Sequence, residues 1–259
     1  MLNLEFVGEG ATTKIYRDGN KAIKLYVNAS PNEAENEAKL QTFAVDTGLP
    51  VPAVFGVRKL DDDMTALDME YISGKPIIHE KMDKDERRNA IGILVKLQCA
   101  VHAINADGLP KLMDRLVWKI THSDFIAQST KDNLLSLLNR LDDGSNNLCH
   151  GDFHPLNILY DGNKYWIIDW VDTAAGNPLA DACRTYLIFK QFMTRSAGIY
   201  LSLFCKEVGV KQEDILTWMP IVAAARLNED MDDKMRVQLL KVLDDWEHFS
   251  CKNATSERG

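Results

Sequence analysis

The sequence predicts an α+β chain in which a small antiparallel β lobe with one helix precedes a larger, mainly helical lobe. Short β-favouring runs separated by turn residues dominate the N-terminal part, a single helix start interrupts them, and helical spacing of apolar residues takes over after Gly74. We expect an N-terminal lobe over 1–70, a linker at 71–74, a second lobe over 75–249 and a flexible tail over 250–259.

The N-terminal lobe is predicted to consist of hairpins around one helix. β-Favouring runs lie at 4–7, 14–17, 22–27, 54–57 and 65–69. The helix start is marked by Ser30 as an N-cap hydroxyl, Pro31 at the first helical position and Glu33 at the third. The helix is predicted to end near Gly48.

Beyond the linker, apolar residues recur at helical spacing. The predicted helices are 85–104, 133–141, 181–193, 197–208, 213–227 and 234–246. Among them lies an irregular piece, 148–170, with two short β runs around Asp161-Gly162-Asn163. The polar chain after Phe249 is expected to be loose.

Composition and charge exclude several classes of protein. The 259 residues carry 30 Lys+Arg against 38 Asp+Glu, a formal charge of −8, which argues against a general nucleic-acid binder and is compatible with cationic small molecules. No apolar run is long enough to span a bilayer, and Met1–Glu5 lacks the features of a signal peptide. The 5 cysteines are scattered and form no Cys-x-x-Cys. We therefore expect a cytoplasmic protein without membrane or nucleic-acid partners.

The most informative segment runs from His150-Gly151-Asp152 through Asn157 to Asp169, which follows the apolar run Trp166-Ile167-Ile168. Amide and carboxylate oxygens suit Mg²⁺, so Asn157 and Asp169 are the candidate metal ligands. Asp152 is then left to accept a hydroxyl proton or to orient that hydroxyl, and His150 is expected to brace the loop through hydrogen bonds. The alternative is a loop of polar turn residues whose buried aspartate caps a hairpin.

A second group of candidate residues lies near the N-terminus. Gly8, Gly10 and Thr12 belong to a loop of small residues between two strands, where backbone N–H groups could approach phosphate oxygens, although a plain hairpin turn would look the same. Lys24 lies within an apolar strand, where an unpaired ammonium is costly, and Glu37 on the following helix is the expected partner. The alternative is a Lys24 side chain that extends to water.

Taken in order, these parts match the template of kinase phosphoryl transfer. The chain resembles the aminoglycoside phosphotransferase and choline kinase-like family of small-molecule kinases. The motifs that carry this resemblance are His150-Gly151-Asp152 with Asn157, Ile168-Asp169-Trp170, Gly176-Asn177-Pro178 with Asp181, Leu49-Pro50-Val51-Pro52 and Met69-Glu70-Tyr71-Ile72-Ser73-Gly74.

The resemblance implies a bilobal protein-kinase-like fold that binds ATP between its lobes. By the same resemblance, Asp152 is the catalytic base, Asn157 and Asp169 bind Mg²⁺, and Lys24, held by Glu37, contacts the α- and β-phosphates. The backbone around Glu70, Tyr71 and Ile72 would form the hinge that binds adenine. The choice between ATP and GTP as donor stays open.

The resemblance also implies transfer of the γ-phosphoryl group to a hydroxyl of a small molecule. About ten residues separate Asp169 from the next helical pattern, which leaves no room for the activation loop on which protein substrates dock. Aminoglycosides and other amine-bearing alcohols or sugars are candidate acceptors. The carboxylates considered for a cationic acceptor are Asp172, Glu229, Asp230 and Asp233, with a solvated helix end as the alternative for Glu229 and Asp230. A catalytically silent kinase-like protein and an atypical protein kinase are the rival functions.

Overall fold

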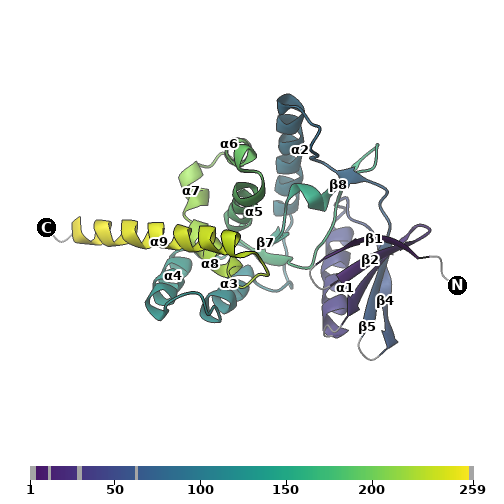
Figure 1. The fold of residues 1–259 in the computed structure, drawn as a ribbon, viewed down its shortest axis with the longest axis horizontal. Helices are drawn as coiled ribbons and strands as arrows, with labels where there is room; N and C mark the ends of the chain where they lie inside the picture. The colour runs from purple at the N-terminus through teal and green to yellow at the C-terminus, as the bar shows by residue number, and fades with distance from the viewer. Residues whose placement is uncertain (1–3, 11–12, 28–30, 62–63, 257–259) are drawn as a thin grey trace. The chain divides into compact units, whose positions relative to one another are not determined.

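The computed structural model describes residues 4–10, 13–27, 31–61 and 64–256, so Thr12 and the predicted N-cap Ser30 lie outside the described residues (Figure 1). The chain divides into two compact units. One consists of Met1–Leu94 with His150–Thr173, and the other of Val95–Cys149 with Ala174–Gly259. The segment with Asp152, Asn157 and Asp169 therefore groups with the N-terminal sheet, whereas the predicted boundary at 71–74 assigned it to the second lobe.

The first unit contains a five-stranded antiparallel sheet in the order β1-β2-β3-β5-β4. Its strands are β1 Glu5–Glu9, β2 Thr13–Asp18, β3 Lys21–Val27, β4 Val54–Asp61 and β5 Met64–Glu70. Helix α1, Pro31–Asp46, lies along the sheet (Figure 1). Tyr26, Ala34 and Leu67 form the buried cluster between them. The predicted antiparallel lobe with a single helix is confirmed, and β3 is its central strand.

A three-stranded sheet completes the first unit, in the order β6-β8-β9. These strands are β6 Lys75–Pro76, β8 Ile158–Tyr160 and β9 Tyr165–Ile167, and the 3₁₀ helix η1, Pro155–Asn157, precedes β8. The Ile167 N–H donates to the Pro50 carbonyl at 2.8 Å. This bond ties the β8–β9 hairpin to the chain that follows α1.

The second unit is mainly helical. Its elements are α3 Leu112–Thr121, α4 Gln128–Leu141, β7 Asn147–Cys149, β10 Ala174–Gly176, α5 Pro178–Phe192, α6 Thr194–Val208, α7 Gln212–Leu216, α8 Met219–Arg226 and α9 Asp233–Ser256. Helix α2, Lys84–His102, begins in the first unit and ends in the second. Over the described ranges, no helix is both long and apolar enough to cross a bilayer.

The helices differ from the sequence prediction chiefly in three places. Helix α3 was not predicted, although Leu112, Leu116 and Ile120 repeat at a spacing of four. The helix predicted over 213–227 is divided into α7 and α8, because Pro220 lacks an N–H and suits the first turn of α8. Helix α9 continues to Ser256, into the tail that was expected to be loose, because 247–256 contains neither Gly nor Pro to end it.

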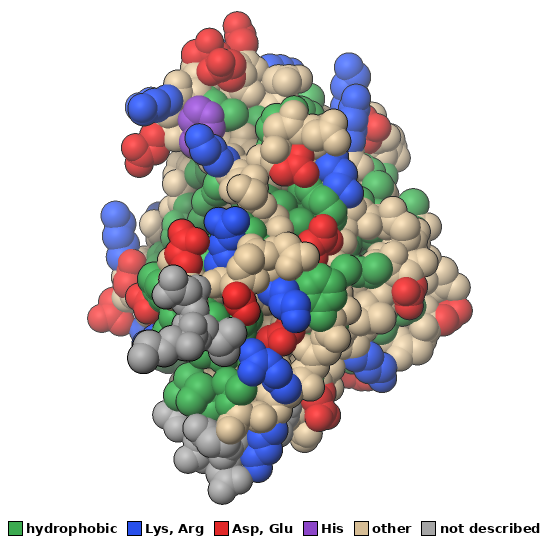
Figure 2. All heavy atoms as spheres, turned by 90° about the vertical axis from the view of Figure 1, so that its right-hand side faces the viewer, with side chains coloured by type: hydrophobic (Ala, Val, Ile, Leu, Met, Phe, Trp, Pro, Cys, Tyr) green, Lys and Arg blue, Asp and Glu red, His purple; other side chains and the backbone are tan. Residues whose placement is uncertain are grey.

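Figure 2 shows one face of the molecule. Basic and acidic side chains of the described residues are interspersed on it, with hydrophobic side chains between them. Charges of mixed sign produce a weak net field at a distance.

Gly151 is required by two separate constraints. Its φ is +82°, and a Cβ built on it would lie 2.1 Å from the Asp172 carbonyl oxygen. We expect Gly151→Ala to lower the free energy of unfolding by about 1–2 kcal/mol from its backbone dihedral alone, and by about 1–3 kcal/mol more from overpacking. Gly48→Ala is the matched control, because Gly48 has φ +80° but open space around it. Both free energies of unfolding are measured in urea, and an equal loss in the two variants would contradict a clash at position 151.

A buried polar network lies in the second unit. Asp181, 3% exposed, accepts hydrogen bonds from His102 Nε2 at 2.8 Å and from Gln98 Nε2 at 3.2 Å. The Tyr200 hydroxyl donates to Gln98 Oε1 at 2.7 Å. The carboxylate thus connects α2 to α5, which fits a structural role for Asp181.

Removing the Asp181 carboxylate is expected to destabilise the fold. We expect Asp181→Ala to lower the free energy of unfolding by about 2–4 kcal/mol, because two buried donors lose their acceptor. Exposed Asp124 is the control, and Asp124→Ala should stay within about 0.5 kcal/mol of the wild type. Denaturant unfolding monitored by circular dichroism measures both. A loss below about 1 kcal/mol for Asp181→Ala would show that the network contributes little.

Candidate active site

The β8–β9 hairpin brings Asn157 and Asp169 together. Ile158 pairs with Ile167 across the hairpin, and the Ile168 N–H donates to the Asn157 carbonyl at 3.0 Å. Asn157 precedes β8 directly and Asp169 follows β9 by two residues, so both lie at the open end of the hairpin. The two side chains separated by 12 positions in sequence therefore share one end of a short sheet.

His150 fixes the loop that carries Asp152. It is fully buried, its ring lies against Phe153 and Trp170, and its Nε2 lies 3.0 Å from the Ile168 carbonyl. Its Nδ1 accepts from the Asp152 N–H at 3.3 Å, so Nε2 carries the proton that is donated to Ile168. The prediction that His150 braces this loop is confirmed.

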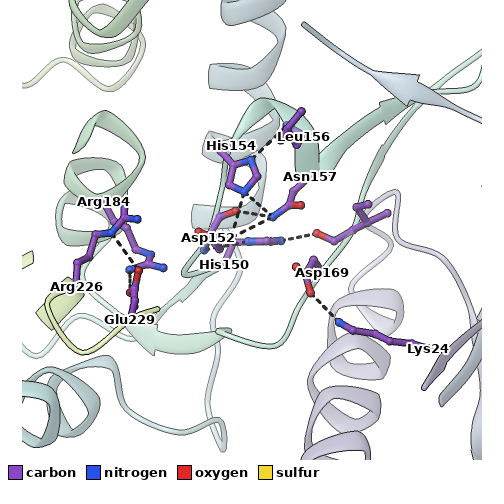
Figure 3. Close-up of polar contacts among 11 residues, drawn as sticks. Lys24, His150, Asp152, His154, Leu156, Asn157, Asp169, Arg184, Arg226 and Glu229 are labelled. Atoms are coloured by element: carbon purple, nitrogen blue, oxygen red, sulfur yellow. Dashed lines mark hydrogen bonds and ion pairs between the residues drawn. The ribbon is translucent and has the colours of Figure 1, made fainter. Parts of the chain in front are cut away.

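The Asp152 carboxylate is held by two neighbours (Figure 3). His154 Nδ1 accepts from the Leu156 N–H at 3.3 Å, so its Nε2 carries the proton and donates to Asp152 Oδ2 at 3.1 Å. Asn157 Nδ2 donates to Asp152 Oδ2 at 3.4 Å and to the backbone carbonyl of the same residue at 2.9 Å. The amide nitrogen of Asn157 is thereby used within the loop, and its oxygen points away from Asp152. Sequence reasoning did not predict this contact of His154 with Asp152.

Lys24 lies in the middle of the sheet and bridges two carboxylates. In β3 it pairs with Ile15 on one side and Leu67 on the other. Its Nζ donates to Glu37 Oε1 at 2.8 Å and to Asp169 Oδ1 at 3.0 Å. The Lys24 residue is only 8% exposed, so the alternative of a side chain in water is wrong.

The charge of Lys24 is stabilised by these partners. Burial by itself would lower the pKa of Lys24, but Glu37 and then Asp169 outweigh it, and the pKa is raised. A lysine whose pKa is raised in the folded state is charged at any pH well below its ordinary pKa of 10.5. The stabilisation from its partners is lost only when the pH rises through the raised pKa. The ammonium is therefore present throughout the neutral range.

Tyr26 is a residue of this cluster that sequence reasoning missed. Its hydroxyl donates to Glu37 Oε2, the oxygen that Lys24 does not contact. Burial and then the Glu37 charge raise the pKa of Tyr26, so the phenol stays protonated. The sequence signal that could have identified Tyr26 is strand alternation, because Lys24 and Tyr26 are two positions apart in β3 and therefore face the same side of the sheet.

Asp169 has a special backbone conformation. Its φ is +66°, a positive value that no other non-glycine residue adopts in the described part of the chain. Asp and Asn tolerate this region better than most residues, and such conformations cluster at functional sites. The conformation occurs at the carboxylate that Lys24 contacts.

A cavity of about 490 Å³ within the first unit gathers these groups. The predicted nucleotide and metal residues that line it are Gly8, Gly10, Lys24, Glu37, Glu70, Tyr71, Ile72, Asn157 and Asp169. The lining also includes apolar residues that were not predicted, among them Val7, Ile15, Ala22, Met69, Leu159 and Ile168. The cavity thus has an apolar part and a charged end.

Glu70 and Tyr71, which line this cavity, are also bonded to neighbouring parts of the first unit. The Glu70 carboxylate accepts from the Ala53 N–H at 3.2 Å, and the Tyr71 N–H donates to the Asn20 carbonyl at 2.9 Å. Arg17 stacks over the Tyr71 ring at 4.5 Å. These contacts hold the linker against the sheet.

A second cavity of about 620 Å³ adjoins the linker and is also lined by Tyr71 and Gly74. Its described lining contains neither Lys24 nor Asp169. Size alone would favour this cavity, but a phosphate site needs cationic and metal-binding groups. We therefore assign the candidate active site to the 490 Å³ cavity.

The four candidate acceptor carboxylates have different surroundings. Asp172 belongs to the first unit and is half-buried, with its backbone against Gly151. Asp230 and Asp233 belong to the second unit and are exposed, which for Asp230 fits the solvated helix end. Glu229 also belongs to the second unit, where it is partly buried.

Glu229 is engaged by three cations. Arg184, Arg226 and Lys119 contact its carboxylate, the last two at 3.1 and 3.3 Å (Figure 3 shows the two arginines). Burial by itself would raise the pKa of Glu229, but Arg184, Arg226 and Lys119 lower it. This carboxylate is already neutralised within its own unit, so it is poorly suited to bind a cationic acceptor.

The oxygen donors present fit Mg²⁺. No group of three His, Cys, Asp or Glu side chains that could hold a metal occurs within the described ranges, which disfavours a closed zinc site. Mg²⁺ usually takes one or two protein oxygens and completes its sphere with water and phosphates. Asn157 and Asp169 supply that number, and both line the cavity.

The fold is kinase-like, with an antiparallel N-terminal sheet and a helical part. A model of the phosphotransferase enzyme family matches residues 4–207, and the chain belongs to this family. A comparison with curated proteins gave no significant match.

Solved structures share this fold at low sequence identity. A thermostable mutant of aminoglycoside phosphotransferase APH(4)-Ia, in a ternary complex with ADP and hygromycin B, is 14% identical with a TM-score of 0.72, over 94% of this chain and 92% of that one. The choline kinase LicA from Streptococcus pneumoniae is 17% identical with a TM-score of 0.67, over 94% of each chain. A GDP and kanamycin complex of APH(2")-IIia is 15% identical with a TM-score of 0.65, over 94% of this chain and 92% of that one.

Proposed function

We propose that this protein is an ATP-dependent kinase that transfers the γ-phosphoryl group to a hydroxyl of a small molecule. The observation that carries the proposal is that one cavity is lined by Gly8 in β1, by Gly10, by the Lys24–Glu37 pair, by Tyr71 and Ile72, and by Asn157 and Asp169. Membership of the phosphotransferase family supports it. The apolar part of the cavity suits a purine base, and its charged end suits the phosphates.

Each residue has a role in the proposed transfer. Lys24 contacts the α- and β-phosphates, and Glu37 holds its ammonium in place. Asn157 and Asp169 hold Mg²⁺, which when bound offsets the phosphate charge. Asp152 orients the acceptor hydroxyl and accepts its proton, while His154 donates a hydrogen bond that fixes this carboxylate. Catalysis thus depends chiefly on positioning and on charge.

The acceptor is proposed to be a small hydroxylated molecule. Helix α5 begins at Pro178, nine residues after Asp169, so the chain between them is too short for an activation loop. Solved structures with this fold contain hygromycin B or kanamycin, or carry the name choline kinase. Aminoglycosides and amine-bearing alcohols and sugars are therefore the first acceptors to test, with Asp172 as a candidate contact.

Nucleotide binding is tested before the acceptor is known. Thermal shift is measured with Mg·ATP, Mg·GTP, and each nucleotide in EDTA, and an active kinase should be stabilised more by the nucleotide with metal than by the same nucleotide in EDTA. Radiolabelled ATP is then incubated with panels of aminoglycosides, amino alcohols and sugars. Label transferred to one acceptor class supports the proposal, whereas Mg·nucleotide binding with no transfer across the panels would favour a silent kinase-like protein.

A further inference from the structure

We propose that Tyr26 is a positioning residue for nucleotide binding, which acts by holding Glu37 in place for Lys24. The inference rests on the proposed function, because it takes Lys24 as the residue that contacts nucleotide phosphates. Tyr26 lies outside the sequence motifs described above, and it enters the site only through the fold.

The two oxygens of Glu37 have one donor each from the same strand. Lys24 Nζ donates to Oε1 at 2.8 Å, and the Tyr26 hydroxyl donates to Oε2. Both donors face α1, since they are two positions apart in β3. The Tyr26 ring is packed with Ala34 and Leu67, so its hydroxyl is oriented before any ligand binds.

The two carboxylates that contact Lys24 differ in exposure. The Glu37 side chain is 1% exposed, whereas the Asp169 side chain is 37% exposed and lines the cavity. Asp169 is open to an incoming cation, and Glu37 is not. Glu37 is therefore the permanent partner of Lys24, and its orientation decides where the ammonium points.

Loss of the Tyr26 hydroxyl should change that orientation. The buried Oε2 would lose its donor, and a buried carboxylate oxygen without a partner is costly. The carboxylate can recover a partner by turning both oxygens toward Lys24, because hydrogen bonds between charged groups are the stronger ones. The ammonium would then be drawn toward α1 and away from the phosphates.

The experiment compares Tyr26→Phe with Tyr16→Phe. Tyr16 lies in the same sheet, on β2, and its ring contacts Phe6 rather than Glu37. Dissociation constants for Mg·ATP are measured by calorimetry well below the lowest melting temperature of the set. We expect Tyr26→Phe to weaken Mg·ATP about tenfold, the equivalent of one hydrogen bond to a charged group, and Tyr16→Phe to change it less than about twofold.

A double-mutant cycle separates positioning from general destabilisation. If Tyr26 acts through Glu37, Tyr26→Phe should change the dissociation constant less than about twofold in a Glu37→Gln background. Replacement of Tyr26 by 4-aminophenylalanine keeps an N–H donor at the same position of the ring, so it should restore most of the affinity. This replacement also provides a folded comparison if Tyr26→Phe proves unstable.

The outcomes distinguish this inference from the proposed function. A wild-type chain that binds Mg·ATP, together with unchanged affinity in Tyr26→Phe or additive effects in the cycle, overturns the assignment of Tyr26 and leaves the proposed function standing. A melting temperature that falls while the dissociation constant stays constant also overturns it. A wild-type chain that binds neither Mg·ATP nor Mg·GTP overturns the proposed function, and this inference with it.

Discussion

Asp152→Asn is expected to lower the rate of phosphoryl transfer by about 10²–10⁴-fold, the usual contribution of a positioned general base. The asparagine keeps the shape of the carboxylate and can still accept from His154 at the position of Oδ2. It cannot take the proton of the acceptor hydroxyl. Steady-state transfer from radiolabelled ATP to the acceptor found in the screen measures the loss.

Nucleotide affinity should survive this change. Asp152 does not line the 490 Å³ cavity, whose described lining contains the groups assigned to the nucleotide. We expect the dissociation constant of Mg·ATP to stay within about threefold of the wild type. Asp245→Asn, at an exposed position of α9, is the charge-matched control and should change neither the transfer rate nor the dissociation constant. Transfer by Asp152→Asn within tenfold of the wild type would remove Asp152 from the chemistry.

Asp169→Asn should abolish the magnesium dependence of nucleotide binding. The substitution removes the only charged metal ligand that we propose. Loss of a group that merely supports a metal ligand usually costs about 10–100-fold in metal affinity, so we expect loss of the ligand itself to weaken Mg·ATP binding by about 100-fold or more. Asparagine is preferred to alanine in this test, because it tolerates the positive φ of +66° at this position. Calorimetry with and without EDTA measures the effect.

The metal-free titration makes this prediction sharper. Asp169→Asn removes a negative charge beside Lys24, so free ATP should bind the variant at least as well as it binds the wild type. Mg²⁺ should therefore raise affinity in the wild type and leave it unchanged in the variant. An equal gain from Mg²⁺ in both proteins would rule out Asp169 as the metal ligand. Unchanged melting temperatures would show that the fold tolerates the substitution.

Sequence patterns predicted much of the first unit because its contacts are local or periodic. The turn chemistry and strand runs around α1 predicted the antiparallel sheet, and an ammonium in an apolar strand required a buried anion. The choice of Glu37 followed from the apolar face of the helix. The ion pair at 2.8 Å agrees with that choice.

Long-range contacts were harder to predict. The hydrogen bond from Tyr26 to Glu37 follows from strand alternation only once α1 is known to cover that face of β3. The three cations around Glu229 come from separate helices, so no local spacing indicates them. Helix α3 does not depend on long-range contacts for its prediction. Its apolar repeat at Leu112 and Leu116 was present in the sequence and was overlooked.

The sequence by itself indicated the class of chemistry that we propose, because candidate oxygen ligands, a buried amine and a loop of small residues are identified by residue type and order. The tertiary structure decided which of these groups meet. Hairpin pairing brings Asn157 to Asp169, and β3 presents Lys24 and Tyr26 to one carboxylate of α1. Residue type sets what a side chain can bind, whereas its partners depend on backbone hydrogen bonds that join segments far apart in the chain.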